Sequence, residues 1–410
     1  MGLNQSGEAE PPDDLSDLSA FVVAFSCKPN SGSEWGVGWN YVEMLSRMFG
    51  SVTLYVRDAE AQREAIEKGL SERSIGNVSP IFVGDMGVYR LFKSPVMHSR
   101  FLPLYYLIWL TRAFYHAAKK KQWRYHNYVF HVTWVSDWIF SPIFLLPFKT
   151  CIVGPLGSQP PNFNKKNRDF YFSNARFFLK SLLRVLLPNF LVSIRASAAI
   201  GINARSLQRW PWKKIANKCV ILPVHSEIEF SGSRCAEKKV FFVGKNLPFK
   251  NLDLFLAVAE KLAISEPDIM FCIIGHMNAS GLKFNRNLPS NVESLGLLDQ
   301  GDIAALLGGS RSILLQPSSE AGGTVGVEAL CLGVPVVCAA GHGVSAFYDD
   351  DYPYSIDFEQ YEIFVSDASS LIISIFADYD SHMTWALSQQ DRLSRDESER
   401  QLREILLLAR

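Results

Sequence analysis

The 410-residue sequence has no net charge, no apolar run of about 20 residues and no pair of cysteines at C-x-x-C spacing. A bilayer-spanning helix needs about 20 consecutive apolar residues, so we expect none here. The seven cysteines are odd in number and scattered, and several lie in apolar runs such as Phe271-Cys272-Ile273-Ile274. This pattern predicts buried free thiols in a reducing compartment, and no metal site.

The N-terminus also lacks the apolar core of a secretory signal, because it is polar and acidic through Asp17. We therefore expect a cytoplasmic protein. Hydrophobic residues make up 48% of the chain and charged residues 20%, which is typical of a globular protein. The length predicts at least two domains.

Negative charge is almost absent from residues 87–226, which hold 21 lysines and arginines against two acidic residues. The same region has two apolar stretches that include or adjoin basic residues, 101–110 and 177–194. Each stretch could be an ordinary amphipathic helix packed on a core. The excess positive charge favours an anionic membrane surface instead, with the protein peripheral at the inner face of the membrane. Nucleic acid is the rival anionic partner, but no nucleic-acid motif accompanies the charge, so we expect none to bind.

Apolar strand-like runs alternate with helical patterns in both halves of the chain. Examples are residues 21–25 and 51–56 in the first half, and 240–243 and 271–274 in the second. This alternation predicts two Rossmann-like, doubly wound parallel sheets of α/β class that face each other across a cleft. We expect a flexible tail over 1–18, a first domain over 19–222, a second over 223–378, and a C-terminal helical segment over 379–410.

The strongest motif is Ser319-Glu320-Ala321-Gly322-Gly323-Thr324-Val325-Gly326-Val327-Glu328, which follows the apolar run 312–315. A glycine loop at the carboxyl end of a strand, opening a helix, exposes backbone N–H groups that attract phosphate. A carboxylate flanks this loop on each side, and carboxylates accept hydrogen bonds from sugar hydroxyls. Phosphate between two hydroxyl sites describes a sugar nucleotide.

Glu328 is not explained by helix capping, because the capping-box position is taken by Val327. The alternative is an ordinary exposed helix glutamate. Lys245 and Lys250 lie in a loop that follows the strand-like run 240–243, where two cations could neutralise a diphosphate leaving group. A solvated loop with lysines is the alternative there, and the glutamate motif favours phosphate binding.

His131 ends the apolar run Val129-Phe130, where it is either a structural histidine or a group that orients a reacting sugar. The glycines from Gly32 to Gly38 follow the first strand but lack the G-x-G-x-x-G spacing of a dinucleotide site. We expect them to let backbone approach a ligand across the cleft.

Taken together, these residues resemble the retaining glycosyltransferases of the GT-B class, family GT4. The Glu320-to-Glu328 spacing is the E-x7-E signature of that family, and the likeness covers residues 240–340 well. It is looser in the first half, where it rests on Gly32 to Trp39, His131 and residues 154–157. The family usually has arginine at the position of Lys245, and lysine keeps the charge but loses the bidentate geometry.

The resemblance implies a hexosyltransferase with retention at the anomeric carbon, needing neither metal nor cofactor. It also implies that the C-terminal helix over 379–410 crosses back to the first domain. It assigns catalytic positions to His131, Lys245, Lys250 and Glu320. It assigns donor binding to Gly32, Gly244, Gly275, Gly296, Gly322, Gly323, Thr324, Val325 and Glu328. The donor would be a nucleoside diphosphate sugar, and the acceptor a saccharide or a lipid-linked saccharide. A sugar-nucleotide epimerase, a phosphorylase or a catalytically silent binding module remain alternatives.

Overall fold

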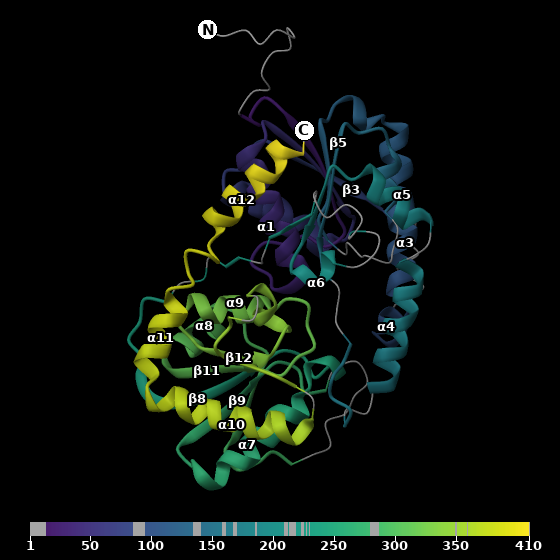
Figure 1. The fold of residues 1–410 in the computed structure, drawn as a ribbon. Coiled ribbons are helices and arrows are strands. Elements are labelled where there is room, and N and C mark those ends of the chain that lie inside the picture. The colour runs from purple at the N-terminus through teal and green to yellow at the C-terminus, as the bar shows by residue number, and fades with distance from the viewer. Residues whose placement is uncertain are drawn as a thin grey trace, which may run out of the picture.

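The computed structural model has two lobes and describes residues 14–84, 95–133, 141–157, 161–166, 170–184, 187–208, 212, 219–222, 225–226, 228, 230–278, 287–348, 351–358 and 360–409 (Figure 1). The predicted tail therefore lies largely outside the described residues. Its inner end is wrong, because Leu15 is fully buried in the core of the first domain. Ordered structure thus begins before residue 18.

The first domain is built on a seven-stranded sheet of order β3-β2-β1-β4-β5-β6-β7, in which every neighbouring pair is parallel. Its strands are β1 (Ser19–Ala24), β2 (Ser51–Arg57), β3 (Val78–Val83), β4 (Tyr128–His131), β5 (Thr150–Leu156), β6 (Ala198–Gly201) and β7 (Cys219–Ile221). Its helices are α1 (Ser33–Met48), α2 (Glu60–Glu72), α3 (Pro95–Lys119), α4 (Phe170–Arg184), α5 (Leu187–Arg195) and α6 (Ala204–Leu207), with short 3-10 helices η2 (Gln122–Arg124) and η3 (Pro142–Leu145).

Both faces of this sheet are buried, as the apolar run in β1 requires. Alternate residues of β1 enter different cores: Val22 faces α1 and α2, and Phe21 and Val23 face α3. Side chains of α3, including Trp109, cover the second face with the residues of η3. Successive side chains of a strand point to opposite faces of the sheet, so each face packs against its own layer of helices.

The second domain has a six-stranded parallel sheet of order β10-β9-β8-β11-β12-β13 and one large core. Its strands are β8 (Cys235–Val243), β9 (Ile269–Ile274), β10 (Val292–Gly296), β11 (Ser310–Gln316), β12 (Val336–Ala339) and β13 (Ser355–Ile356). Its helices are α7 (Leu252–Ser265), α8 (Gln300–Gly308), α9 (Thr324–Cys331), α10 (Tyr361–Ala377) and α11 (Tyr379–Leu387), with η5 (Pro248–Lys250) and η6 (Gly343–Phe347).

The chain returns to the first domain through α12 (Arg395–Leu408), which runs beside the upper lobe in Figure 1. Its Leu402, Ile405 and Leu406 are buried in the first-domain core. The segment predicted to cross back was too long, because α11 still belongs to the second domain. Tyr379 in α11 is buried there, and its hydroxyl bonds to the backbone of Ser312.

An ion-pair cluster fixes the start of α12 against α1. Arg395 and Glu43 are only 5% and 4% exposed, and their charged atoms lie 3.3 Å apart. Glu43 also pairs with Arg73, and Arg395 with Glu399 at 3.1 Å. A buried charge without its partner is strongly unfavourable, so this cluster holds the returning helix in one position.

We expect Arg395→Ala to lower the free energy of unfolding by about 3 kcal/mol, because it leaves Glu43 and Glu399 short of a cation. Chemical denaturation measures the change. The control is Arg403→Ala in the same helix, whose exposed arginine lies 3.9 Å from Asp14 and contributes at most about 1 kcal/mol. Equal losses for the two variants would contradict this account of the helix anchor.

Candidate functional site

The order of strands in the second sheet brings two distant loops together. Strands β8 and β11 are neighbours, but β8 is followed by β9 toward one edge of the sheet and β11 by β12 toward the other edge. The point between two such strands is called a topological switch point, and ligands bind there in this architecture. The loop after β8 carries Lys250 and the loop after β11 carries Glu320. Their charged atoms lie 2.7 Å apart, in a site that is mostly shielded from solvent.

Glu320 is held by more than this ion pair. One of its oxygens accepts hydrogen bonds from the Ser318 hydroxyl at 3.0 Å and from the Gln316 amide at 3.3 Å. Both partners lie within four residues of Glu320, at the end of β11. The carboxylate therefore has a fixed orientation before any ligand arrives.

Helix α9 begins just beyond Glu320, and no side chain caps its first turn. A Cβ at Gly323, which precedes the helix, would lie 2.5 Å from the side-chain amide of Gln316. A side chain at this position would displace the Gln316 amide that hydrogen-bonds to Glu320. Gly323, Thr324 and Val325 line the first cavity, so the uncapped N–H groups at the start of α9 lie at its wall. Those groups and the helix dipole favour an anion.

Two adjoining cavities occupy the space between the domains. The first has a volume of about 240 Å³, and Lys250, Glu320 and the start of α9 line its second-domain wall. The second has a volume of about 540 Å³, and Gln300 and Glu328 are among its lining residues. The two cavities share four of their lining residues: Val37, Asn40, His225 and Thr324. A ligand can therefore extend from Lys250 to Glu328 along the start of α9.

Glu328 lies at the second cavity and is nearly buried. Its carboxylate accepts a hydrogen bond of 2.8 Å from Gln300 in the first turn of α8. Burial raises the pKa of Glu328 to about 7, and the bond from Gln300 opposes that rise. An exposed helix glutamate would not show this, so the alternative interpretation of Glu328 is wrong.

The structure brings most of the predicted donor-side residues into this cleft. They are Lys250, Glu320, Gly322, Gly323, Thr324, Val325 and Glu328. Lys245 is exposed and does not line either cavity. Gly244, Gly275 and Gly296 also lie outside both linings, and they end three neighbouring strands at positive φ, where glycine is least strained. Gly32 precedes α1 and lines neither cavity, whereas Gly36, inside α1, lines the second.

His131 is placed away from the cavities, inside the first domain. Its two ring nitrogens are hydrogen-bonded to the hydroxyls of Tyr106 and Ser141, each at 2.9 Å. Burial lowers the pKa of His131 to about 3, so the ring is neutral at ordinary pH. The structural role that the sequence left open matches this environment, and His131 is not among the residues that line the two cavities.

Several cleft residues had no sequence signal of their own. Gln300 and Gln316 are glutamines without a motif, and His225 lies in the connection between the domains. Glu34 and Asn40 are in α1, which begins at Ser33 and therefore includes most of the Gly32-to-Gly38 segment. The position of that segment at the end of β1 was the signal that could have found them, because ligands bind at the carboxyl ends of such strands.

Comparison with known proteins finds a family match over most of the second domain. Residues 225–372 match the family described as Glycosyl transferases group 1. D-inositol 3-phosphate glycosyltransferase of Mycobacterium sp. (strain KMS) is 32% identical over 117 residues, which are 26% of this chain and 26% of that protein. The same enzyme of Mycobacteroides abscessus is 34% identical over 122 residues, 28% of this chain and 27% of that one. The match thus spans about a quarter of each relative.

Solved structures are similar over nearly the whole chain. TarM has a TM-score of 0.64 at 13% identity, covering 96% of this chain and 98% of that one. Sucrose-phosphate synthase from Thermosynechococcus elongatus has a TM-score of 0.62 at 12% identity, covering 95% and 98%. An S. aureus TarM mutant solved with Fondaparinux, alpha-GlcNAc-glycerol and UDP has a TM-score of 0.60 at 12% identity, covering 96% and 99%. The predicted GT-B fold is confirmed, and the narrower assignment to GT4 stays a prediction.

The raised pKa of Glu328 predicts how stability depends on pH. Its pKa is higher in the folded protein than in the unfolded chain, so its contribution is complete below about pH 4.5 and is lost as the pH rises through about 7. Relative to wild type, Glu328→Gln should therefore gain stability between pH 5 and pH 8, by up to about 3 kcal/mol. Denaturant titrations of both proteins across this range measure the difference, and a difference that does not change with pH would contradict the buried-carboxyl assignment.

Proposed function

We propose that this chain, a GT-B protein whose residues 225–372 match the glycosyl transferases group 1 family, transfers a hexose from a nucleoside diphosphate sugar to an acceptor hydroxyl. The observation that carries the proposal is the pairing of Lys250 with Glu320 beside the open start of α9. We further propose that the transfer retains the anomeric configuration and needs no metal, as the E-x7-E resemblance implies.

The ion pair restricts the ligands that can enter the first cavity. A simple anion would compete for Lys250 but leave Glu320 without its cation, and a simple sugar would do the reverse. A phosphorylated sugar satisfies both, because its phosphate replaces the carboxylate beside Lys250 while its hydroxyls donate to Glu320. Ligand binding therefore exchanges one set of charged hydrogen bonds for another.

The second cavity supports a nucleotide as the other half of the ligand. Glu328 and Gln300 lie together there, where a carboxylate and an amide can bind the two hydroxyls of a ribose. Thr324 lines both cavities, so a diphosphate joining the two halves would lie at the start of α9. TarM, with the same fold, was solved with UDP.

In the proposed reaction, the bond between the anomeric carbon and the phosphate oxygen breaks and the diphosphate gains charge. Lys250 and the first backbone N–H groups of α9 face that charge without rearranging, which is how fixed donors lower a barrier. Glu320 holds the sugar in one orientation. Lys245 follows the same strand as Lys250, and we propose that it contributes charge when the cleft closes.

Loss of either partner of the ion pair should abolish turnover. We expect Lys250→Ala and Glu320→Ala to lower the transfer rate by about 100-fold or more, since each removes a contact made to the reacting sugar phosphate. Release of nucleoside diphosphate from a panel of UDP-, GDP- and ADP-hexoses, with saccharide and lipid-linked acceptors, measures the rate. Lys261→Ala, which changes an exposed lysine in α7, is the matched control. Wild-type turnover in Lys250→Ala and Glu320→Ala would contradict the site assignment.

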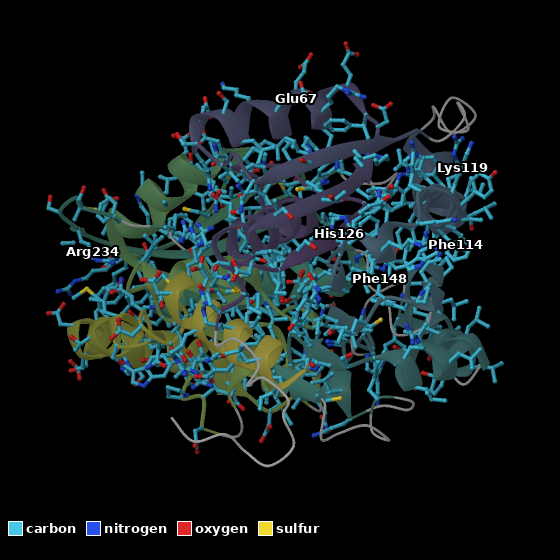
Figure 2. All side chains as sticks on the ribbon, turned by 90° about the horizontal axis from the view of Figure 1, so that it is seen from above. Glu67, Phe114, Lys119, His126, Phe148 and Arg234 are labelled. Atoms are coloured by element: carbon cyan, nitrogen blue, oxygen red, sulfur yellow. The ribbon has the colours of Figure 1, made fainter. Side chains whose placement is uncertain are left out.

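A surface for an anchored acceptor lies on one side of the first domain. Helices α3, α4 and α5 lie together on that side, and Phe114 and Lys119 of α3 are at the opposite edge from Arg234 of the second domain (Figures 1 and 2). Large apolar side chains are exposed on these helices and on η3: Leu104, Leu107, Tyr115, Leu145, Tyr171, Phe178, Leu179, Leu182, Leu191 and Ile194. Exposed basic side chains of the same region are Lys119, Lys120, Lys121, Arg124, Lys149, Arg176 and Arg195.

Ordinary amphipathic helices bury their apolar faces, yet Phe178 and Leu182 of α4 are 70% and 64% exposed. Apolar side chains among lysines and arginines suit an interface with anionic lipid, where the chains enter the headgroup region and the cations remain outside. None of the described helices combines the length and the apolar character that crossing a bilayer requires. We therefore propose that the protein lies on the cytoplasmic face of a membrane and takes a lipid-linked saccharide as its acceptor.

The paired substitution Phe178→Glu and Leu182→Glu should weaken binding to vesicles of phosphatidylglycerol and phosphatidylcholine at least about tenfold, because it replaces insertion by charge repulsion. Vesicle co-sedimentation measures the binding. Ile264→Glu is the control for a single apolar-to-glutamate change, at a 90% exposed residue of the second domain, and the single variant Phe178→Glu is its match in charge. The membrane proposal would be contradicted if wild type did not bind the vesicles. It would also be contradicted if the paired variant and the control bound them as well as wild type does.

A further inference from the structure

Two buried asparagines of the first domain lie close to the loops that carry Lys250 and Glu320, the donor-side ion pair. Asn162 lies beyond the carboxyl end of β5 and Asn203 beyond that of β6, and each is only 2% exposed. Strands β5 and β6 are parallel neighbours, so both asparagines leave the sheet at the same edge. In this architecture that edge is where ligands bind.

Each asparagine donates its side-chain amide to a backbone carbonyl of a different donor loop. The Asn203 amide bonds to the carbonyl of Ala321, which directly follows the glutamate of the ion pair. The Asn162 amide bonds at 3.4 Å to the carbonyl of Pro248, two residues before the lysine of the pair. The first domain thus holds the backbone beside each member of the ion pair.

The other side-chain atom of each asparagine is fixed within its own turn. Oδ1 of Asn203 accepts hydrogen bonds from the backbone N–H and from the hydroxyl of Ser206, each at 2.9 Å. Oδ1 of Asn162 accepts a bond of 3.0 Å from the backbone N–H of Asn164, whose own amide bonds to Asp253 of the second domain at 2.9 Å. Each donating amide group is therefore oriented by local contacts.

The bond from Asn203 acts on the part of the glutamate loop that lines the first cavity. Because a peptide group is planar, holding the Ala321 carbonyl also sets the direction of the Gly322 N–H, and Gly322 lines that cavity. The preceding carbonyl, that of Glu320, accepts a bond of 3.0 Å from the N–H of Gly343 in the second domain. The backbone on either side of this turn is thus held by different domains.

The two donor loops are also bonded to each other. The N–H of Ser319 donates to the carbonyl of Phe249 at 2.7 Å, and the amide of Asn251 donates to the carbonyl of Pro317 at 2.9 Å. The loops therefore form one unit within the second domain, and the two first-domain asparagines attach this unit at two points.

We propose that Asn162 and Asn203 are positioning residues of the transfer reaction, which hold the donor-side ion pair in register with the first domain. This inference rests on the proposed function. Neither asparagine lines the two cavities, so both act through the backbone of the donor loops. Losing one bond lets a loop shift relative to the acceptor side, and a misplacement of about 1 Å can lower a rate about 100-fold.

An aspartate at either position separates the bond between the domains from the local turn. A carboxylate keeps the accepting oxygen that Asn162 and Asn203 use within their own turns, but it has no N–H to donate. At Asn203, which is the N-cap of α6, aspartate is as good a cap as asparagine. The substitution therefore removes the contact with the second domain and leaves the local contacts in place.

The kinetic test compares Asn162→Asp and Asn203→Asp with wild type. Nucleoside diphosphate release from the UDP-, GDP- and ADP-hexose panel, with saccharide and lipid-linked acceptors, gives kcat and the donor KM. We expect each variant to lower kcat by at least about tenfold and to change the donor KM by less than about threefold, because the groups that contact the nucleotide are intact.

Asn77→Asp is the matched control. The Asn77 amide donates to the carbonyls of Ser46 and Phe49 at 2.7 and 2.8 Å, all within the first domain. The substitution thus removes bonds of the same kind without breaking a contact between domains. It should lower the thermal stability and leave kcat at the wild-type value.

Amide hydrogen exchange without any ligand tests the positioning directly. Asn203→Asp should speed exchange of the Gly343 amide, which is bonded to the glutamate loop, by about three- to tenfold. Asn162→Asp should have the same effect on the Ser319 amide, which is bonded to the lysine loop. Asn77→Asp should leave both amides at their wild-type rates.

The two measurements distinguish this inference from the proposed function. Wild type that shows no thermal shift with UDP, GDP or ADP and transfers no hexose of the panel contradicts the proposed function, while the exchange rates still decide whether the asparagines hold the loops. If the asparagine variants exchange as wild type does, or keep its kcat, this inference alone is overturned. An equal loss of kcat in Asn77→Asp would also overturn it, because the effect would then be one of stability.

Discussion

The ion pair between Lys250 and Glu320 is the contact on which the proposed function depends. It joins the lysine that a phosphate would bind to the carboxylate that a sugar would bind, so a ligand that carries both groups can replace both sides of the contact. The pair lies at the switch point between β8 and β11, and Ser318 and Gln316 hold Glu320 in place. The proposed specificity for a sugar phosphate follows from this one contact, and the adjoining cavity with Glu328 extends it to a nucleotide.

The two domains divide the proposed chemistry between them. The second domain supplies the cation, the open helix start and two carboxylates for the donor, whereas the described first-domain wall is apolar or neutral except for Glu34. Helix α12 and its buried Arg395 connect these halves by packing on α1, the helix that carries Glu34. The exposed apolar and basic side chains of α3, α4 and α5 belong to the same first domain, so acceptor binding and membrane contact are proposed for one half of the molecule.

The sequence predicted the fold class and the donor-side loop because both depend on local patterns. Strand periodicity indicates parallel sheets, and the spacing from Glu320 to Glu328 places two carboxylates on either side of a helix start. It could not predict His131, because the same residue at the end of a strand can face the core or the cleft, and its hydrogen bonds to Tyr106 and Ser141 decide the matter. Likewise, Lys245 and Lys250 are equivalent in sequence, and only the conformation of their loop makes one line the cavity. Glu34 and Gln300 lie in different domains, and only the packing of one domain against the other shows that they line the cavities of the cleft.

A crystal structure of the chain with the nucleoside diphosphate that it binds most tightly tests the central claim most directly. The account predicts phosphate oxygens at the N–H groups of Gly323, Thr324 and Val325 and at the Lys250 ammonium, with the ribose hydroxyls on Glu328. A nucleotide bound elsewhere, or bound in the cleft with its ribose beside Glu320 and the Lys250–Glu320 pair intact, would contradict it.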